Sequence, residues 1–191
     1  MEINPIYKND QAQKEIALQF QKQKEEKFPA ITLCDFFTKT IFNYLEKEFL
    51  SLDYQKKIEP LSHSFSQGIV SQKIHDFFHQ KDFLNFLSLI LGKRVKAISL
   101  DAKALSWKDY TLINDEKKEK GEFDLLFSFS DWNVDFGGSI FYVDGSFDFA
   151  QIYPQKNSLT LVQRKENVQR YLKYVNSLAQ EKKLFLLVGI V

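Results

Sequence analysis

The chain has little histidine: His63, His75 and His79 are the three in its 191 residues, and none follows residue 79. Imidazole-based catalysis and imidazole metal ligation are therefore excluded from the whole C-terminal part. Cys34 is the single cysteine, so an intrachain disulfide and a cysteine-based zinc site are excluded as well. A reducing, cytoplasmic setting is the expectation for such a chain.

The chain also lacks an excess of charge of either sign, with 26 basic and 25 acidic residues. This balance favours neither nucleic acid nor an anionic membrane as a partner. The longest apolar runs, residues 83–91 and 184–191, are too short to cross a bilayer. The first ten residues are polar and contain no apolar signal core. The prediction is a cytoplasmic protein with neither a nucleic-acid nor a membrane partner.

Helical periodicity dominates the N-terminal half. Residues 8–27 are predicted to form a helix started by Asn9 or Asp10, and residues 28–37 a short strand that enters a second helix. Asp35 is the predicted N-cap of that second helix, and Phe37, Ile41, Leu45 and Phe49 are predicted to line one face of it.

Residues 51–70 show no clear period and are predicted to be loop with one short strand. Two helices are expected near 71–80 and 82–91, capped by Ser71 and Asp82 and ended by Gly92.

The pattern changes at Val95, where short β-prone segments begin. They are VKAISLDAKAL, DYTLIN, FDLLFSF, SIFYVDG, FDFAQIY, SLTLVQR, VQRYLKYV and KLFLLVGIV. Asp144-Gly145 is a strong hairpin signal, and Gly137-Gly138 reads as a backbone turn because no phosphate-loop context surrounds it. Helices followed by strands predict an α+β fold in which helices pack on one side of a sandwich or jelly roll. One domain is expected over 1–191, with a helical extension (1–27), helical support (28–93) and a β-core (94–191).

Several segments resemble one known family. FPAITLCDFF, DFLNFLSLILG, DYTLINDE, DWNVDFGG, QKNSLTLV and the terminal FLLVGIV occur in order at the spacing of the prolyl-hydroxylase-like 2-oxoglutarate/iron(II) dioxygenases. The chain is most similar to the branch that hydroxylates a ribosomal-protein proline. The resemblance covers about Phe28 to Val191 and implies a distorted double-stranded β-helix, a form of jelly roll, for the β-core.

The same resemblance locates the iron site and finds its ligands replaced. The family's His-x-Asp pair falls on Asn114 and Glu116, and its distal histidine falls near Gln169 or Arg170. The basic anchor of 2-oxoglutarate falls near Lys182 or Lys183, with Tyr110 as a further cosubstrate contact. An amide oxygen is a weaker ligand of iron(II) than imidazole, and lysine lacks the bidentate fork of arginine.

Other candidate sites have simpler explanations. His75 and His79 are one helical turn apart, which suits a metal clamp, but no third ligand follows, and a helix surface with Phe77 and Phe78 turned inward explains the spacing. His63 is expected in a solvated loop, and Cys34 is expected to be a small buried hydrophobe. Aromatic residues of the C-terminal half are expected mostly in core or sheet packing; these are Trp107, Tyr110, Trp132, Phe136 and Tyr142.

Three functional readings stay open. The first is a catalytically degenerate dioxygenase-like protein that needs no cofactor and binds a protein or small ligand in the residual groove. The second is an active hydroxylase of peptidyl proline or a related side chain, with iron(II) and 2-oxoglutarate. Its metal would be held by Glu116 with Asp115 or Asn114, or by a histidine from the helical half. The third is a dimerisation or assembly unit, and the oligomeric state is left undetermined by the sequence.

Overall fold

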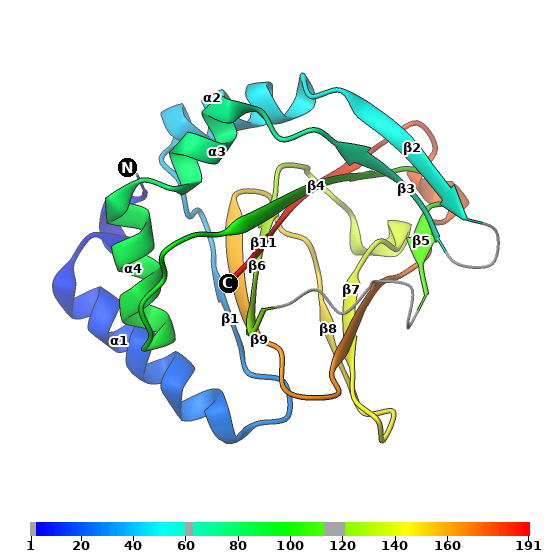
Figure 1. The fold of residues 1–191 in the computed structure, drawn as a ribbon. Coiled ribbons are helices and arrows are strands. Elements are labelled where there is room, and N and C mark those ends of the chain that lie inside the picture. The colour runs from blue at the N-terminus through cyan, green and yellow to red at the C-terminus, as the bar shows by residue number, and fades with distance from the viewer. Residues whose placement is uncertain (1–2, 60–62, 113–120) are drawn as a thin grey trace.

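Two antiparallel sheets face each other, and helices cover the outer face of the larger one. The computed structural model describes residues 3–59, 63–112 and 121–191. Figure 1 shows the helices gathered on one side and the small sheet on the other side of the large sheet. The arrangement is jelly-roll-like.

The large sheet runs in the order β1-β9-β6-β11-β4-β3-β2, and β5 pairs with β3. The bounds of its strands are Ala30–Leu33 (β1), Tyr54–Glu59 (β2), His63–Gly68 (β3), Ser99–Leu105 (β4), Tyr110–Thr111 (β5), Phe123–Ser128 (β6), Ser158–Gln163 (β9) and Leu184–Ile190 (β11). The small sheet has the order β10-β7-β8 and consists of Gln169–Leu172 (β10), Ile140–Val143 (β7) and Phe149–Ile152 (β8). All the predicted β-prone segments beyond Val95 form strands.

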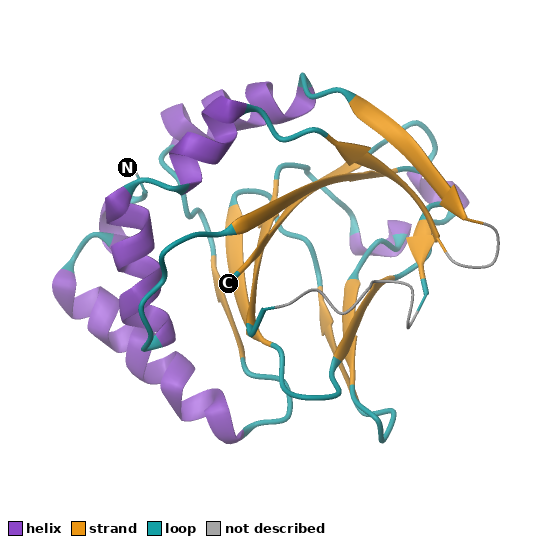
Figure 2. Cartoon of the chain, in the orientation of Figure 1, coloured by secondary structure: helices purple, strands orange, loops and turns teal. Residues whose placement is uncertain are grey.

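The α-helices lie in the first half of the chain, and Figure 2 draws the helices in purple. They are Asp10–Lys22 (α1), Lys39–Leu50 (α2), Gln72–Phe78 (α3) and Lys81–Leu91 (α4). Short 3-10 helices occur at Pro5–Tyr7 (η1), Gln23–Glu25 (η2), Val134–Phe136 (η3) and Ser177–Ala179 (η4). No helix among the described residues is long and apolar enough to cross a membrane.

Strand alternation creates two separate cores, because successive side chains point to opposite faces of a sheet. In β6, Phe123, Leu125 and Phe127 face the helices, whereas Leu126 faces the small sheet. The first core is rich in phenylalanine: the Phe127 ring lies 4.8 Å from that of Phe78, measured between centroids. The second core fills the space between the two sheets, which we call the intersheet space.

Local hydrogen bonds start and stop the helices at specific residues. The Asn9 side chain accepts from the backbone of Gln11 and Ala12 and starts α1, and Ser71 caps α3 in the same way. Gly92 ends α4 in the left-handed conformation (φ +67°), where a Cβ would be strained. These caps confirm the predictions made for Asn9, Ser71 and Gly92.

Other sequence predictions of the helical half were wrong. Thr38 precedes α2 as its N-cap, because Asp35 sits in a left-handed turn (φ +48°) and cannot begin the helix. Gln80, rather than Asp82, precedes α4. Phe37 lies before α2 rather than on it, and Phe42 is buried on the helix in addition to the predicted Leu45 and Phe49.

The segment 51–70 forms a strand pair rather than a loop. β2 and β3 pair from Tyr54↔Gly68 to Glu59↔His63 and extend the large sheet past β4. Successive side chains of β2 are exposed, so its sequence shows neither the helical nor the alternating pattern of hydrophobic residues. His63 is consequently a strand residue whose ring packs 5.2 Å from that of Phe65.

The Phe127→Ala variant tests the first core. Removing a ring that contacts Phe36, Phe37, Phe78 and Phe83 leaves a cavity that the surrounding aromatic rings cannot fill. The free energy of unfolding should fall by about 3–5 kcal/mol in urea denaturation. The matched control is Phe147→Ala, since the Phe147 side chain is 83% exposed; it should change stability by less than about 0.5 kcal/mol. Equal losses in the two variants would contradict this assignment of the core.

Candidate functional site

The intersheet space is the place where the resemblance predicts a metal. The large sheet lines it with the inward side chains of β6, β9 and β11, and the small sheet with those of β7 and β10. Most of them are aliphatic. The leucine and isoleucine members are Leu105, Leu126, Ile140, Leu172, Leu184, Leu186 and Ile190.

The predicted site residues are distributed as follows. Asn114 and Glu116 lie outside the described residues. Gln169 opens β10 half-buried, with Val143 as its strand partner. Its neighbour Arg170 is the inward-facing residue, opposite the buried Tyr142.

The predicted cosubstrate anchors do not meet Gln169. Tyr110 is half-buried in β5, and its ring lies 6.3 Å from that of Tyr174. Lys183 is exposed and directly precedes β11. Because β11 places its first residue beside Leu105 and its last beside Asp124, Lys183 and Asp124 lie at opposite ends of the sheet.

A buried carboxylate is the dominant polar feature of the intersheet space. Asp124 is 0% exposed, and the Tyr142 hydroxyl donates to its Oδ2 over 2.9 Å. Arg170 Nη1 lies 2.9 Å from Oδ2, and Arg164 Nε lies 3.0 Å from Oδ1. These four residues, which we call the Asp124 cluster, join β6, β7, β10 and the segment after β9.

Electrostatics explain why the Asp124 cluster must act as a unit. Burying one charge costs several kcal/mol, and the cost is offset only by close opposite charges and hydrogen bonds. Arg164 is anchored a second time, because its Nη2 donates to the carbonyl of Gly121 over 3.1 Å. Two guanidinium groups therefore face one carboxylate inside the protein.

A third cation, Lys103, points inward from β4. Lys103 is 3% exposed; its Nζ lies 3.4 Å from Asp101 Oδ2 and 4.9 Å from the centroid of the Phe65 ring. The ammonium is thus held by a carboxylate and by an aromatic face. Together with the Asp124 cluster, it makes the polar part of the intersheet space rich in protein cations.

The described residues do not fit an iron site of the predicted type. They contain no group of three histidine, cysteine, aspartate or glutamate side chains able to hold a metal ion. Asp124, the fully buried carboxylate, is engaged by two arginines. One cavity between the sheets, lined by Leu126, Ile140, Ile152 and neighbouring residues, measures about 10 Å³, which is roughly the space for one water molecule.

The other candidate sites are occupied by structural contacts. His79 Nδ1 lies 2.8 Å from the carbonyl oxygen of His75, and its Nε2 accepts from the Ile98 amide over 3.1 Å. Both ring nitrogens of His79 are therefore engaged by backbone, although the His75 and His79 rings stack at 3.9 Å. Phe77 and Phe78 are buried, as expected, and Gly137-Gly138 form a turn with positive φ.

Two expectations about burial were wrong. Cys34 is exposed, because it follows edge strand β1 at a turn, and its Sγ contacts Gln155 Oε1 at 3.3 Å. Trp107 is 46% exposed instead of packed in the core, because the turn after β4 carries it outward.

The sequence did contain a signal for the Asp124 cluster that the sequence analysis missed. FDLLFSF places a charged residue inside an otherwise apolar strand, and a strand buried on both faces accepts such a residue only with a partner. The partners Arg164 and Arg170 follow some 40 residues later, so only their neighbourhood in the fold reveals the pairing.

Comparison with known proteins identifies the family. The family described as "Oxoglutarate and iron-dependent oxygenase degradation C-term" matches residues 47–188, which is most of the chain. The chain belongs to this family. A curated relative, prolyl 3-hydroxylase OGFOD1 of Xenopus laevis, is 23% identical over 224 aligned positions that cover 94% of this chain. The chain spans 43% of the length of that relative.

Solved structures with a similar fold include an oxygenase family member and two prolyl hydroxylases. A 2OG-Fe(II) oxygenase family oxidoreductase of Burkholderia pseudomallei matches with a TM-score of 0.71 and 10% identity, over 95% of this chain and 91% of its own. A prolyl-4-hydroxylase of Pseudomonas putida matches with 0.70 and 8%, over 92% and 97%. A Trichoplax adhaerens prolyl hydroxylase, in complex with a hypoxia inducible factor peptide fragment, matches with 0.69 and 10%, over 94% and 90%. At these identities the likeness concerns the fold alone.

The Asp124→Ala variant tests the role of the buried carboxylate. It removes the anion that two buried guanidinium groups face, so the free energy of unfolding should fall by about 3–5 kcal/mol. Arg170→Met should cost less, because Arg164 and Tyr142 still satisfy Asp124. The control is Lys73→Ala in the exposed Lys73–Glu48 pair (3.2 Å), which should cost less than about 1 kcal/mol. Urea denaturation of the three variants gives the order, and a neutral Asp124→Ala would contradict the proposed charge balance.

Proposed function

We propose that this chain is a non-catalytic member of its oxygenase family, built on a distorted double-stranded β-helix, that acts as a binding or scaffolding module. The observation that carries the proposal is the Asp124 cluster. An iron(II) site of this family type needs imidazole and carboxylate ligands with open positions. Here protein cations occupy the polar part of the intersheet space, and the sequence has no histidine beyond His79.

The positively charged side chains in the intersheet space also disfavour the binding of a metal ion there. A divalent metal placed near Asp124 would have to displace Arg164 or Arg170 from its carboxylate, and the displaced guanidinium would then be buried beside the metal charge. Like charges at such distances in a poorly solvated interior repel by several kcal/mol. In this proposal, the guanidinium groups of Arg164 and Arg170 supply the positive charge that a metal ion would otherwise supply.

A protein segment is the proposed kind of partner. The hydroxylase of Trichoplax adhaerens binds a peptide fragment, which supports a peptide-recognition ancestry for the fold. The single-domain organisation over 1–191 and a cytoplasmic location complete the proposal.

The alternative function is an active 2-oxoglutarate/iron(II) hydroxylase of peptidyl proline. Its support is the name of the relative, prolyl 3-hydroxylase. Its metal would have to be held by Glu116 with Asp115 or Asn114, which lie outside the described residues, or by Glu116 with a histidine from the helical half.

Ligand titration distinguishes the two functions. A ligand present at 100 times its Kd stabilises the native state by about 2.7 kcal/mol, which raises the melting temperature of a chain this long by roughly 5–10 °C. Manganese(II), as a redox-stable substitute for iron(II), with 2-oxoglutarate should give no saturable rise here. The prolyl-4-hydroxylase of Pseudomonas putida, titrated identically, is the positive control. A saturable rise in this chain that needs both additives would refute the non-catalytic proposal.

Restoring the family ligands at two positions is a second test. The Asn114→His, Glu116→Asp double variant should form no succinate from 2-oxoglutarate, because Gln169 and the inward Arg170 still replace the distal imidazole. Succinate formation is measured with and without iron(II). Turnover by the double variant would mean that the remainder of a working site is present.

A further inference from the structure

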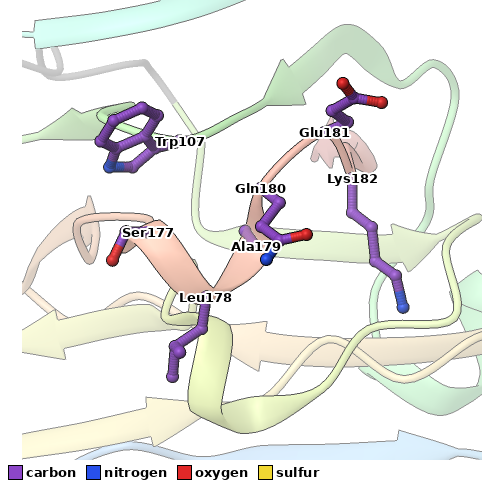
Figure 3. Close-up of a pocket in the computed structure, with 7 residues that line it drawn as sticks. All are labelled: Trp107, Ser177, Leu178, Ala179, Gln180, Glu181 and Lys182. Carbon is purple, nitrogen blue, oxygen red and sulfur yellow. The ribbon is translucent and has the colours of Figure 1, made fainter.

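A second candidate site lies at the opposite end of the sheets from the Asp124 cluster. It is a surface hollow of about 680 Å³ between Trp107, in the β4–β5 connection, and the segment Ser177–Lys182, which connects β10 to β11. Figure 3 shows the Trp107 ring on one side of the hollow and Leu178 and Gln180 on the other. The pairing of Leu105 with Leu184 and of Asp124 with Ile190 separates the two sites by the length of β11.

The exposed Trp107 is held on a rigid turn. Asp109, 1% exposed, accepts hydrogen bonds from the Ser106 amide (2.9 Å), the Ser106 hydroxyl (3.0 Å) and the Ser64 hydroxyl (2.6 Å), and it pairs with Lys56. The Lys108 amide donates to the Val175 carbonyl over 2.9 Å, and the Val175 amide donates to the Asp109 carbonyl over 2.8 Å. A large aromatic surface presented on such a turn loses little conformational entropy when it binds.

The opposite wall of the hollow is equally ordered. Asn176 accepts from the Leu178 amide over 2.8 Å and donates to the Asp135 carbonyl over 2.6 Å, while Leu178 itself is 62% exposed. Gln180 has φ +47° and ψ −117°, a strained conformation for a residue with a Cβ. Strain of this kind persists where the surroundings fix it and is concentrated at functional sites.

Two lysines at the hollow favour a negatively charged partner. Lys108 Nζ lies 4.4 Å from the centroid of the Trp107 ring, and Lys182 Nζ lies 5.2 Å from that of Phe136. Neither lysine takes part in an ion pair between described residues. The lining itself holds one charge of each sign, Glu181 and Lys182. Lys108, which lies against the Trp107 ring, adds a second cation beside the hollow.

We propose that this hollow docks an acidic segment of a partner protein that inserts one aliphatic or aromatic side chain between Trp107 and Leu178. Tryptophan is among the residues that contribute most to binding at protein interfaces, and apolar contact with it excludes water. Carboxylates of the segment pair with Lys108 and Lys182, whose ammonium groups are already placed by the aromatic rings. This site is independent of the Asp124 cluster and of any loss of catalysis.

Selection of random peptides displayed on phage against the whole chain tests the proposal. The recovered peptides should carry an excess of aspartate and glutamate around an apolar residue. One recovered peptide is then synthesised with a fluorescent label, and its affinity is measured by anisotropy. Trp107→Ala should weaken binding about tenfold or more. The Lys108→Glu, Lys182→Glu double variant should weaken it similarly and should remove the salt dependence that the unaltered chain shows.

Phe149→Ala is the matched control, because Phe149 is an exposed aromatic residue (61%) on the small sheet, away from the hollow. It should leave the affinity within about twofold, since it removes no contact with the peptide. Melting temperatures confirm folding of each variant, and the charge variant alters only surface lysines. The proposal fails if no acidic peptide is recovered, if basic peptides bind as well, or if Trp107→Ala and the charge variant both bind like the unaltered chain.

Discussion

The carboxylate of Asp124 constrains the architecture more than any other group in the described chain. It lies between the two sheets and accepts a hydrogen bond from the Tyr142 hydroxyl. It also faces the guanidinium groups of Arg170 in β10 and of Arg164 in the segment after β9. Because a buried charge is tolerated only when opposite charges surround it, β6, β7, β10 and the segment after β9 must hold their relative positions. The apolar residues around the cluster contribute free energy of burial, and the buried charges add the requirement that their partners stay within ion-pair distance.

The two-sheet fold does not depend on the side chains that carry out the chemistry of the family. Structural relatives share the two-sheet framework at 8–10% identity, so the framework depends on the pattern of inward and outward residues rather than on particular side chains. A metal holds several strands together when its ligands come from those strands. An aspartate that pairs with arginines from several strands has the same effect. The cavity near Leu126, between the sheets, has roughly the space for one water molecule.

The two ends of the sheets differ in how they expose apolar groups. At the end with the Asp124 cluster, charges are turned inward and neutralised. At the other end, the buried Asp109 serves as the centre of a turn that carries Trp107 outward, and cations lie over exposed rings. The exposed tryptophan on this rigid support is the feature on which the proposed docking site rests.

Sequence alone determined that helices come first and short strands follow beyond Val95, and it identified the caps Asn9, Ser71 and Gly92, because periodicity and capping are local properties. It also determined that no histidine follows residue 79. It did not reveal the β2–β3 pair, whose exposed side chains follow neither period, or the outward turn of Trp107. The pairing of Asp124 with Arg164 and Arg170 was decided only by tertiary structure. Residues some 40 positions apart become partners when the sheets close, and burial then makes that pairing obligatory.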